Sequence, residues 1–320
     1  MNRFKLLFLI ISIYTFDLQG PSGLKNYGNI CYMNATLQAL FACRPLNNEL
    51  ARLNLYNKLE GDKLAQNYFS LFKEYRKSNE PIISPVEFMN CAREINLLPG
   101  QNINAQQDAS EFLGQFLDHL NKPTLQKLFR ISIRTYYECS DEVIDNKLEN
   151  LSKLDLDFPD MHDQKSIRLD DLFKKFYEQE IYTDSAPKCF SNKSKNLTRN
   201  WKMFTALPEV LIIVPKLFGA TLKNGVYSPF KIHNPILYDL RPLALSLEKT
   251  QTWYNLFACV IHTGSINGGH YVSVVRYGNQ WFFCDDTQVT QITHEKARDY
   301  MEGRDGRVNG QGYIYFFERI

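Results

Sequence analysis

Two groups of residues, far apart in the chain, have side chains suited to covalent catalysis. Cys31 lies near the start with Asn26 upstream of it, and His270 lies near the end, followed by Asp285 and Asp286. A Cys with a nearby imidazole forms a nucleophile and its base, and a carboxylate behind the ring fixes its tautomer and stabilises its charged form. Such a set cleaves acyl bonds through a thioester, and the amide of Asn26 could be aimed at the oxyanion.

Each group also has a plainer interpretation. Free Cys is among the residue types most often buried for structural reasons. A His–Asp pair in a sheet is more often structural than catalytic when nothing else accompanies it. The two groups therefore indicate catalysis only when they are taken together, as nucleophile, base and orienting acid.

The surroundings of Cys31 predict a helix N-terminus. A loop rich in Gly and Asn, residues 23–29, runs into an apolar stretch, 32–40, with helical spacing. The first turn of a helix carries free N–H groups and partial positive charge, which stabilise a thiolate and can hold an oxyanion.

The surroundings of His270 predict a pair of strands. His270 stands at the head of one apolar run, Asp285 and Asp286 end the next, and a turn at Tyr277–Asn279 separates them. Antiparallel pairing through that turn would bring Asp285 back beside His270. Because neighbouring strand residues point to opposite sides, only one of the two acids can face the imidazole squarely.

The rest of the chain is mostly helical in its first third and rich in strands in its last third, with a mixed segment between them. A polar loop is expected between the first two strands of the mixed segment. Helices are predicted at residues 62–77, from Ser84-Pro85 onward, from Asp108 (a candidate N-terminal cap) to Leu120, and at 169–180; strands are predicted at 129–137, 153–158, 210–214, 253–262 and 312–318.

Composition limits the possible partners and cofactors. The chain has 320 residues, of which 44% are hydrophobic, and a formal charge of +2, so it can bury a large core and offers nothing that favours nucleic acid. The seven Cys are odd in number and scattered, which argues against a disulfide framework and favours a reducing compartment. Cys139 and Cys189 stand alone where Cys-x-x-Cys pairs would have indicated zinc, so no metal is expected.

The N-terminal segment gives a conflicting indication of compartment. Residues 1–22 contain an apolar run, 6–13, preceded by basic residues, which resembles a signal peptide but is too short for a comfortable membrane span. Of four Asn-x-Ser/Thr sequons, the one at Asn34 falls on a helix expected to be buried, where a glycan would not fit. A cytoplasmic or nuclear location is therefore expected, without stable membrane insertion, and a secretory one stays the alternative.

Several long phrases also resemble one family, the ubiquitin-specific proteases. GLKNYGNICYMNATLQAL is similar to that family's Cys box, and HTGSINGGHYVSVVRYGNQWFFCDDTQV to its His box. QQDASEF, LPEVLIIVPKLF and GYIYFFER resemble the blocks between and after them, in the family's order. The resemblance covers the chain from Gly23 to about Arg319.

The resemblance implies a role for individual residues. By position, Cys31 is the nucleophile, His270 the base and Asp285 the orienting acid, with Asp286 as an auxiliary acid and Asn26 as the oxyanion-hole amide. Four further residues fall where the family contacts the substrate tail or lines its cleft: Asp108, His262, Gly269 and Tyr271.

The resemblance also implies the fold and the reaction. It predicts an α+β, papain-like fold over residues 23–319, with a helical thumb at about 23–134, fingers at about 135–205 and a palm at about 206–319. The implied activity is thiol-dependent hydrolysis of the bond after ubiquitin's C-terminal glycine, by a monomer that acts on ubiquitin and ubiquitinated proteins without a cofactor. A protease for another ubiquitin-like modifier, a catalytically weak ubiquitin-binding homologue and a secreted papain-like peptidase remain the alternatives.

Overall fold

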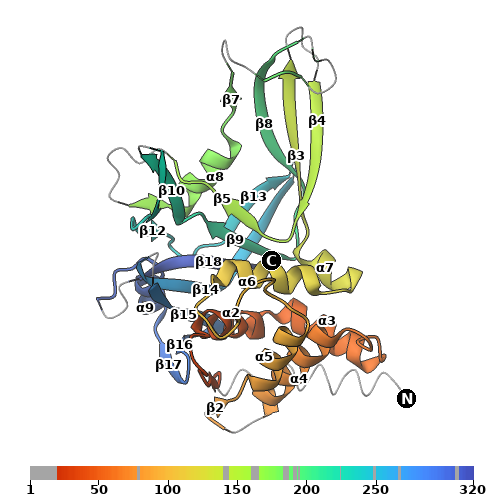
Figure 1. Cartoon of the computed structure of the whole chain (residues 1–320), viewed down its shortest axis with the longest axis vertical. Coiled ribbons are helices and arrows are strands. Elements are labelled where there is room, and N and C mark those ends of the chain that lie inside the picture. Colours follow the sequence, from red (N-terminus) through yellow and green to blue (C-terminus); the bar gives the residue numbers. More distant parts are fainter. Residues whose placement is uncertain are drawn as a thin grey trace.

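The computed structural model describes residues 20–77, 80–139, 144–159, 166–182, 187–189, 193, 195–223, 225–247, 250–265, 268–306 and 310–320 (Figure 1). All but the last three residues of the N-terminal segment 1–22 lie outside these ranges, including the apolar run 6–13. Among the described helices, none is long and apolar enough to cross a membrane.

Six helices at one end of the molecule form the part expected to be the thumb, coloured red to yellow in Figure 1. All residues of the first of them, α2, are buried, because its sequence is apolar or small on nearly every side. Phe41 near its end packs against Tyr68, Phe72 and Tyr75, which recur at helical spacing along one face of α4. The helices are α2 (Cys31–Ala42), α3 (Arg44–Leu55), α4 (Lys63–Lys77), α5 (Val86–Glu94), α6 (Ala109–His119) and α7 (Pro123–Phe129).

An eight-stranded sheet forms the palm, and α2 packs against it through β14 and β15. The strand order is β17-β16-β15-β14-β18-β9-β5, with β13 paired to β14 off this path. All six residues of β9 are buried, which agrees with its continuous apolar sequence. The strands are β5 (Leu154–Leu156), β9 (Val210–Pro215), β13 (Leu243–Leu247), β14 (Thr250–Ser265), β15 (Gly268–Tyr277), β16 (Gln280–Asp285), β17 (Gln288–Ile292) and β18 (Gly310–Arg319).

A separate four-stranded sheet, ordered β4-β3-β8-β7, projects away from the palm and corresponds to the expected fingers (Figure 1). It is built from β3 (Ile131–Cys139), β4 (Ile144–Leu151), β7 (Glu180–Ile181) and β8 (Leu197–Ala206). Smaller elements complete the fold: the pair β1 (Gly23–Leu24) and β2 (Ile82–Ile83), the pair β6 (Ile167–Arg168) and β12 (Ile236–Leu237), the hairpin β10 (Phe218–Lys223) and β11 (Val226–Lys231), and helices α8 (Leu169–Tyr177) and α9 (His294–Met301).

The structure differs from the sequence-based expectations in the middle of the chain. The expected polar loop contains strand β4, which pairs with β3 over eight positions. Its many polar and charged residues made the strand resemble a loop, because this sheet is partly open to solvent. Strand β5, within the range expected for the fingers, instead pairs with β9 in the palm sheet. A buried parallel partner so distant in sequence leaves no local signal.

The sequence analysis expected no disulfide framework, and the structure contains one disulfide, a pairing that the sequence did not indicate. Cys139 and Cys189 form a disulfide across a sequence separation of 50 residues, while Cys31, Cys43, Cys91, Cys259 and Cys284 are free and buried. The odd count concealed the pair, because one bridge among five other cysteines forms no recognisable framework. The location in a reducing compartment stays a prediction.

Candidate active site

Cys31 is the first residue of α2 and is 5% exposed. Ile30 occupies the N-cap position, and within the described chain no side chain caps this helix end. The preceding loop turns at Gly28, whose φ of +119° is accessible to glycine and strained for other residues. The sulfur therefore lies beside a helix N-terminus, as the sequence predicted.

His270 on β15 faces Asp285 at the end of β16, with 2.6 Å between Nε2 and Oδ1. The strand register explains the contact. Val274 pairs with Phe283 and Ser273 with Cys284, so His270 and Asp285 are diagonal neighbours on one face beyond the last paired positions. The geometric prediction that the turn returns Asp285 to His270 is confirmed.

The charge on this imidazole is stabilised from two sides. Hydrogen bonds to Asp285 and to Cys31 raise the pKa of His270 to about 10, although partial burial acts in the opposite direction. Since Nε2 meets Asp285, Nδ1 is the nitrogen left to face the sulfur. A protonated ring in this position can donate to both neighbours at once.

Asp286 has different partners from Asp285. Its backbone is left-handed, with φ of +48°, a conformation that Asp tolerates better than most residues. One carboxylate oxygen accepts a hydrogen bond from Nδ2 of Asn26 at 2.7 Å, and the other accepts one from Nδ2 of Asn34 at 2.7 Å. The Asp286 carbonyl also accepts from the backbone N–H of Leu24 at 2.7 Å. This carboxylate thus ties the loop before Cys31 and the helix after it to the palm.

The network includes one residue whose role the sequence did not indicate. In the sequence, Asn34 is recognisable only as part of a sequon. In the structure it is 1% exposed and hydrogen-bonded to Asp286 inside the site. Its position one turn after Cys31 on a buried helix was the available signal. A glycan at Asn34 is incompatible with this burial.

Asp108 is the N-cap of α6, as one interpretation of the sequence expected. Its Oδ1 accepts from the N–H groups of Ser110 at 2.8 Å and Glu111 at 2.9 Å. Its Oδ2 accepts from the hydroxyls of Tyr271 at 3.3 Å and Tyr313 at 2.7 Å. Both oxygens are thus occupied, and the carboxylate joins α6 to β15 and β18.

His262, Gly269 and Tyr271 lie together beside this carboxylate. His262 is 3% exposed, its ring contacts that of Tyr271, and burial lowers its pKa to about 3. A Cβ at Gly269 would collide with the Thr263 carbonyl and lie 2.5 Å from Nε2 of His262, so the backbone here requires glycine. His262 is therefore neutral and packed, and it supports the strand that carries His270.

A polar bridge crosses from the thumb to the palm near His270. Nε2 of Gln106, in the loop before α6, donates to the carbonyl oxygen of Gly269 at 2.7 Å. Gln106 belongs to the phrase QQDASEF, and no local pattern distinguishes it from its neighbours. The contact links the segment ahead of Asp108 to the residue ahead of His270.

Within the described residues, one group of His, Cys, Asp and Glu side chains has ligand atoms close enough to share a metal: His270, Asp285 and Asp286. Each already has a hydrogen-bond partner, namely one another or the amides of Asn26 and Asn34. In the fingers, Cys139 and Cys189 are joined as a disulfide, and sulfur in that form is not the thiolate that zinc binds.

A thumb of helices, a palm sheet and a projecting finger sheet, with a Cys heading a buried helix opposite a His–Asp pair, define a papain-like cysteine-protease fold. The protein-family model described as "Ubiquitin carboxyl-terminal hydrolase" matches residues 22–317. The chain therefore belongs to the ubiquitin carboxyl-terminal hydrolase family.

Individual relatives and structures agree with this assignment. The chain is 26% identical over 355 residues to ubiquitin carboxyl-terminal hydrolase 4 of Arabidopsis thaliana, covering 93% of each protein. It is 27% identical over 345 residues to "Probable ubiquitin carboxyl-terminal hydrolase 4" of Schizosaccharomyces pombe, covering 88% of this chain but only 57% of that protein. A solved structure described as the SAGA Ubp8/Sgf11/Sus1/Sgf73 DUB module bound to ubiquitin aldehyde matches all of this chain and 76% of that one. The TM-score is 0.76 and the identity 22%, a likeness that shows the shared fold.

Proposed function

We propose that this protein is a thiol-dependent deubiquitinase that hydrolyses the bond after the C-terminal glycine of ubiquitin. The observation that carries the proposal is the geometry of the site. His270 on β15 is hydrogen-bonded to Asp285 at 2.6 Å, and Cys31 heads α2, the helix that packs against β15. Membership of the ubiquitin carboxyl-terminal hydrolase family supports the choice of substrate.

The first half of the reaction forms a thioester. His270 accepts the proton of Cys31, and the thiolate attacks the carbonyl carbon after the terminal glycine. The carbonyl oxygen becomes an oxyanion, which the backbone N–H of Cys31 and the amide of Asn26 would stabilise, about 3 kcal/mol for one such donor. Protonated His270 then donates its proton to the leaving lysine amine as the carbon–nitrogen bond breaks.

The second half releases the product. Water loses a proton to His270 as its oxygen attacks the thioester carbonyl, and the same donors hold the second oxyanion. The carbon–sulfur bond breaks, ubiquitin leaves with a free carboxylate, and Cys31 returns to its starting state. Asp285 holds the imidazole in the orientation that both proton transfers need.

Asp286 serves the oxyanion hole rather than the base. Its hydrogen bond to Nδ2 of Asn26 fixes that amide, which has a second N–H to offer the oxyanion. Asn34 donates to the other carboxylate oxygen and so holds Asp286 in place. The two adjacent acids therefore have different roles: Asp285 orients the base, and Asp286 orients an oxyanion donor.

The substrate tail would lie between α6 and β15. Asp108 at the start of α6 would line this passage from the thumb, and Tyr271, His262 and Gly269 would line it from the palm. Asp108 and Tyr271 are hydrogen-bonded to each other, and the ring of His262 contacts that of Tyr271. Asp108 acts there by fixing Tyr271 and the start of α6.

An electrophilic probe tests the proposal directly. Ubiquitin carrying a C-terminal electrophile should form one covalent adduct on wild-type protein, mapped by peptide mass to Cys31, and none on the Cys31→Ala variant. The same electrophile on other modifiers with Gly-Gly tails provides the comparison. Faster labelling by another modifier would assign the protein to that modifier, and an adduct on a different Cys would overturn the site.

A further inference from the structure

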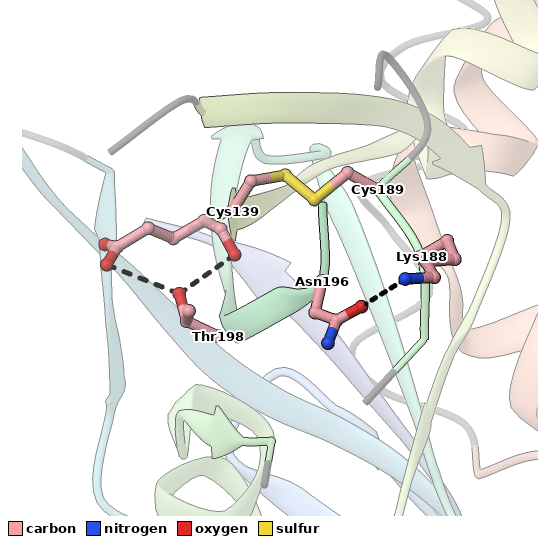
Figure 2. Close-up of a disulfide and its surroundings, with 6 residues drawn as sticks. Cys139, Lys188, Cys189, Asn196 and Thr198 are labelled. Atoms are coloured by element: carbon pink, nitrogen blue, oxygen red, sulfur yellow. Dashed lines mark hydrogen bonds between the residues drawn. A yellow bond between two sulfur atoms is a disulfide. The ribbon is translucent and has the colours of Figure 1, made fainter. Parts of the chain in front are cut away.

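The far end of the fingers is closed by a disulfide. Cys139 is the last residue of β3, and Cys189 lies in the short segment 187–189 beside the start of β8 (Figure 2). Their Cα atoms are 6.2 Å apart. The two residues are 2% and 1% exposed and, with Leu197, form a small apolar cluster separate from the main core.

Apart from this bond and the small apolar cluster around it, the described contacts of segment 187–189 are hydrogen bonds to residues just ahead of β8 and at its start. The N–H of Cys189 donates to the carbonyl of Lys195 at 3.0 Å, and the N–H of Leu197 donates to that of Pro187 at 2.9 Å. Nζ of Lys188 also donates to Oδ1 of Asn196 at 2.8 Å (Figure 2). These contacts fold the segment onto its own continuation into β8, whereas the disulfide fastens it to β3, 50 residues earlier.

The neighbouring strand adds little support. β7 pairs with β8 at only two positions, and the β3–β8 ladder shifts register between Glu138 and Cys139. A sheet edge with few paired positions opens easily. The disulfide is therefore the strongest connection across this end of the fingers.

The remaining cysteines do not compete for this role. Cys43, Cys91, Cys259 and Cys284 are buried in the thumb and palm, and burial raises the pKa of each of these thiols. High thiol pKa and burial make them poor partners for thiol–disulfide exchange. The chain thus combines a single active-site thiol with a single disulfide.

We propose that Cys139 and Cys189 form a redox-controlled staple that fixes the fingers in the conformation that binds the folded body of the modifier. The proposal rests on the proposed function, because it concerns how that substrate is held. In the reduced state the segment 187–189 would detach from β3 and binding would weaken, while the chemistry at Cys31 would stay intact.

The redox step is a two-electron exchange with a dithiol reductant. One thiolate of the reductant attacks one sulfur of the staple to form a mixed disulfide, and the other protein sulfur leaves and takes up a proton. The second thiol of the reductant then loses its proton and attacks the reductant sulfur that is bonded to the protein. The second protein thiol is released, and the reductant leaves as its disulfide. Because both cysteines are buried, the first attack follows local opening of segment 187–189, whose Pro187 and Lys188 are exposed.

Counting thiols tests whether the staple forms. Full-length protein equilibrated in an oxidising glutathione buffer should, after denaturation, take up five alkyl groups, and seven after prior reduction. Peptide mapping should find Cys139 joined to Cys189. Seven reactive thiols without reduction would overturn the proposal.

Kinetics test whether the staple controls binding. A ubiquitin–fluorophore conjugate and a short fluorogenic peptide with ubiquitin's C-terminal sequence should be compared on oxidised and reduced protein. Both forms must have Cys31 confirmed as a free thiol. Reduction should raise KM for the ubiquitin conjugate about tenfold, through the added cost of ordering the fingers. Turnover of the peptide should change less than twofold.

Variants separate the staple from other redox effects. The Cys139→Ser/Cys189→Ser double variant should show the raised KM at every redox poise, and Cys91→Ser, a matched change outside the fingers, should keep the wild-type response. An unchanged KM in reduced protein would overturn the proposal. Uptake of one zinc per reduced chain with KM preserved would also overturn it. Loss of turnover on both substrates in all forms would instead count against the proposed function.

Discussion

The active-site cleft and the fingers are held together in different ways. In the cleft, Asn26, Asn34 and Asp286 meet across more than 250 residues of sequence through hydrogen bonds alone. In the fingers, a single covalent bond joins Cys139 to Cys189. The cleft lies against the main core, whereas the disulfide lies in a small cluster of its own.

This difference determines what a change in each region can do. A cleft held by several directional contacts fixes the position of reacting groups to within a few tenths of an ångström, which catalysis needs. The far end of the projecting sheet, where one disulfide joins β3 to segment 187–189, can be loosened without disturbing those groups. Cleft substitutions should therefore change turnover, and finger substitutions should change binding and local stability.

The largest expected effect is loss of the nucleophile. Cys31→Ala should abolish hydrolysis of a ubiquitin C-terminal amide while leaving ubiquitin binding nearly intact, because the change removes one sulfur from a buried helix start. Steady-state kinetics and calorimetry measure the two quantities. Residual turnover above a few per cent in clean protein would mean that another group attacks the carbonyl.

The second largest effect concerns the orientation of the base. Asp285→Ala should lower kcat by up to roughly four orders of magnitude, the cost known for the corresponding acid in a serine protease. The loss should be smaller if the hydrogen bond from His270 to Cys31 keeps the ring in place. Rates for Asp285→Ala and Asp286→Ala decide the assignment, and a greater loss from Asp286→Ala would reverse the two roles.

The contact between His270 and Asp285 also predicts a pH dependence. Since Asp285 raises the pKa of His270, the alkaline limb of kcat/KM should lie near pH 10 in the wild type and move to lower pH in Asp285→Asn. The folded-state pKa is higher than the unfolded value of about 6.5, so this contact stabilises the fold fully below that pH. Its contribution should be lost as the pH rises toward 10. Chemical denaturation across pH 6–10 should show that loss in the wild type and a weaker one in Asp285→Asn.

An intermediate effect is expected for the acid that holds the oxyanion donor. Asp286→Ala frees Asn26 and should lower kcat by roughly 10²–10³, the cost of one oxyanion-hole donor. Because Asp286 acts on a different group from Asp285, the alkaline limb of the pH profile should stay in place. Movement of that limb would show that Asp286 acts through the imidazole instead.

How much of this arrangement was predictable differs between the two regions. The helix at Cys31, the strands around His270 and the return of Asp285 follow from local patterns: apolar periodicity, Gly-containing turns and strand alternation. The partnership of Asn34 with Asp286 does not, because it depends on how a helix packs against a distant strand end.

The fingers were less predictable for a physical reason. Strands β3 and β4 pair in a sheet that is partly open to solvent. Such a sheet needs no clear alternation of apolar and polar residues, so the sequence of β4 resembled a surface loop. Cys139 and Cys189 have no common motif, and their pairing depends only on where two distant segments end. No local pattern in the sequence predicts that these two segments meet.

The smallest effect on turnover is expected from the fingers. Removing a disulfide that closes a 50-residue loop should cost about 4 kcal/mol if the fingers unfold together with the rest, since the cross-link restricts the unfolded chain. If the fingers open on their own, the free energy of unfolding of the core stays nearly unchanged. The loss then appears only as weaker hydrogen-exchange protection in β7, in residues 187–189 and at the start of β8.

The second outcome is the expected one. The cluster around Cys139, Cys189 and Leu197 is separate from the core, and β7 contributes only two paired positions. In the Cys139→Ser/Cys189→Ser double variant, exchange should therefore accelerate in those segments while α2 and β15 keep their protection and kcat changes less than twofold. Faster exchange throughout the thumb and palm would show that the fingers and the cleft unfold as one unit, and the distinction drawn between them would fail.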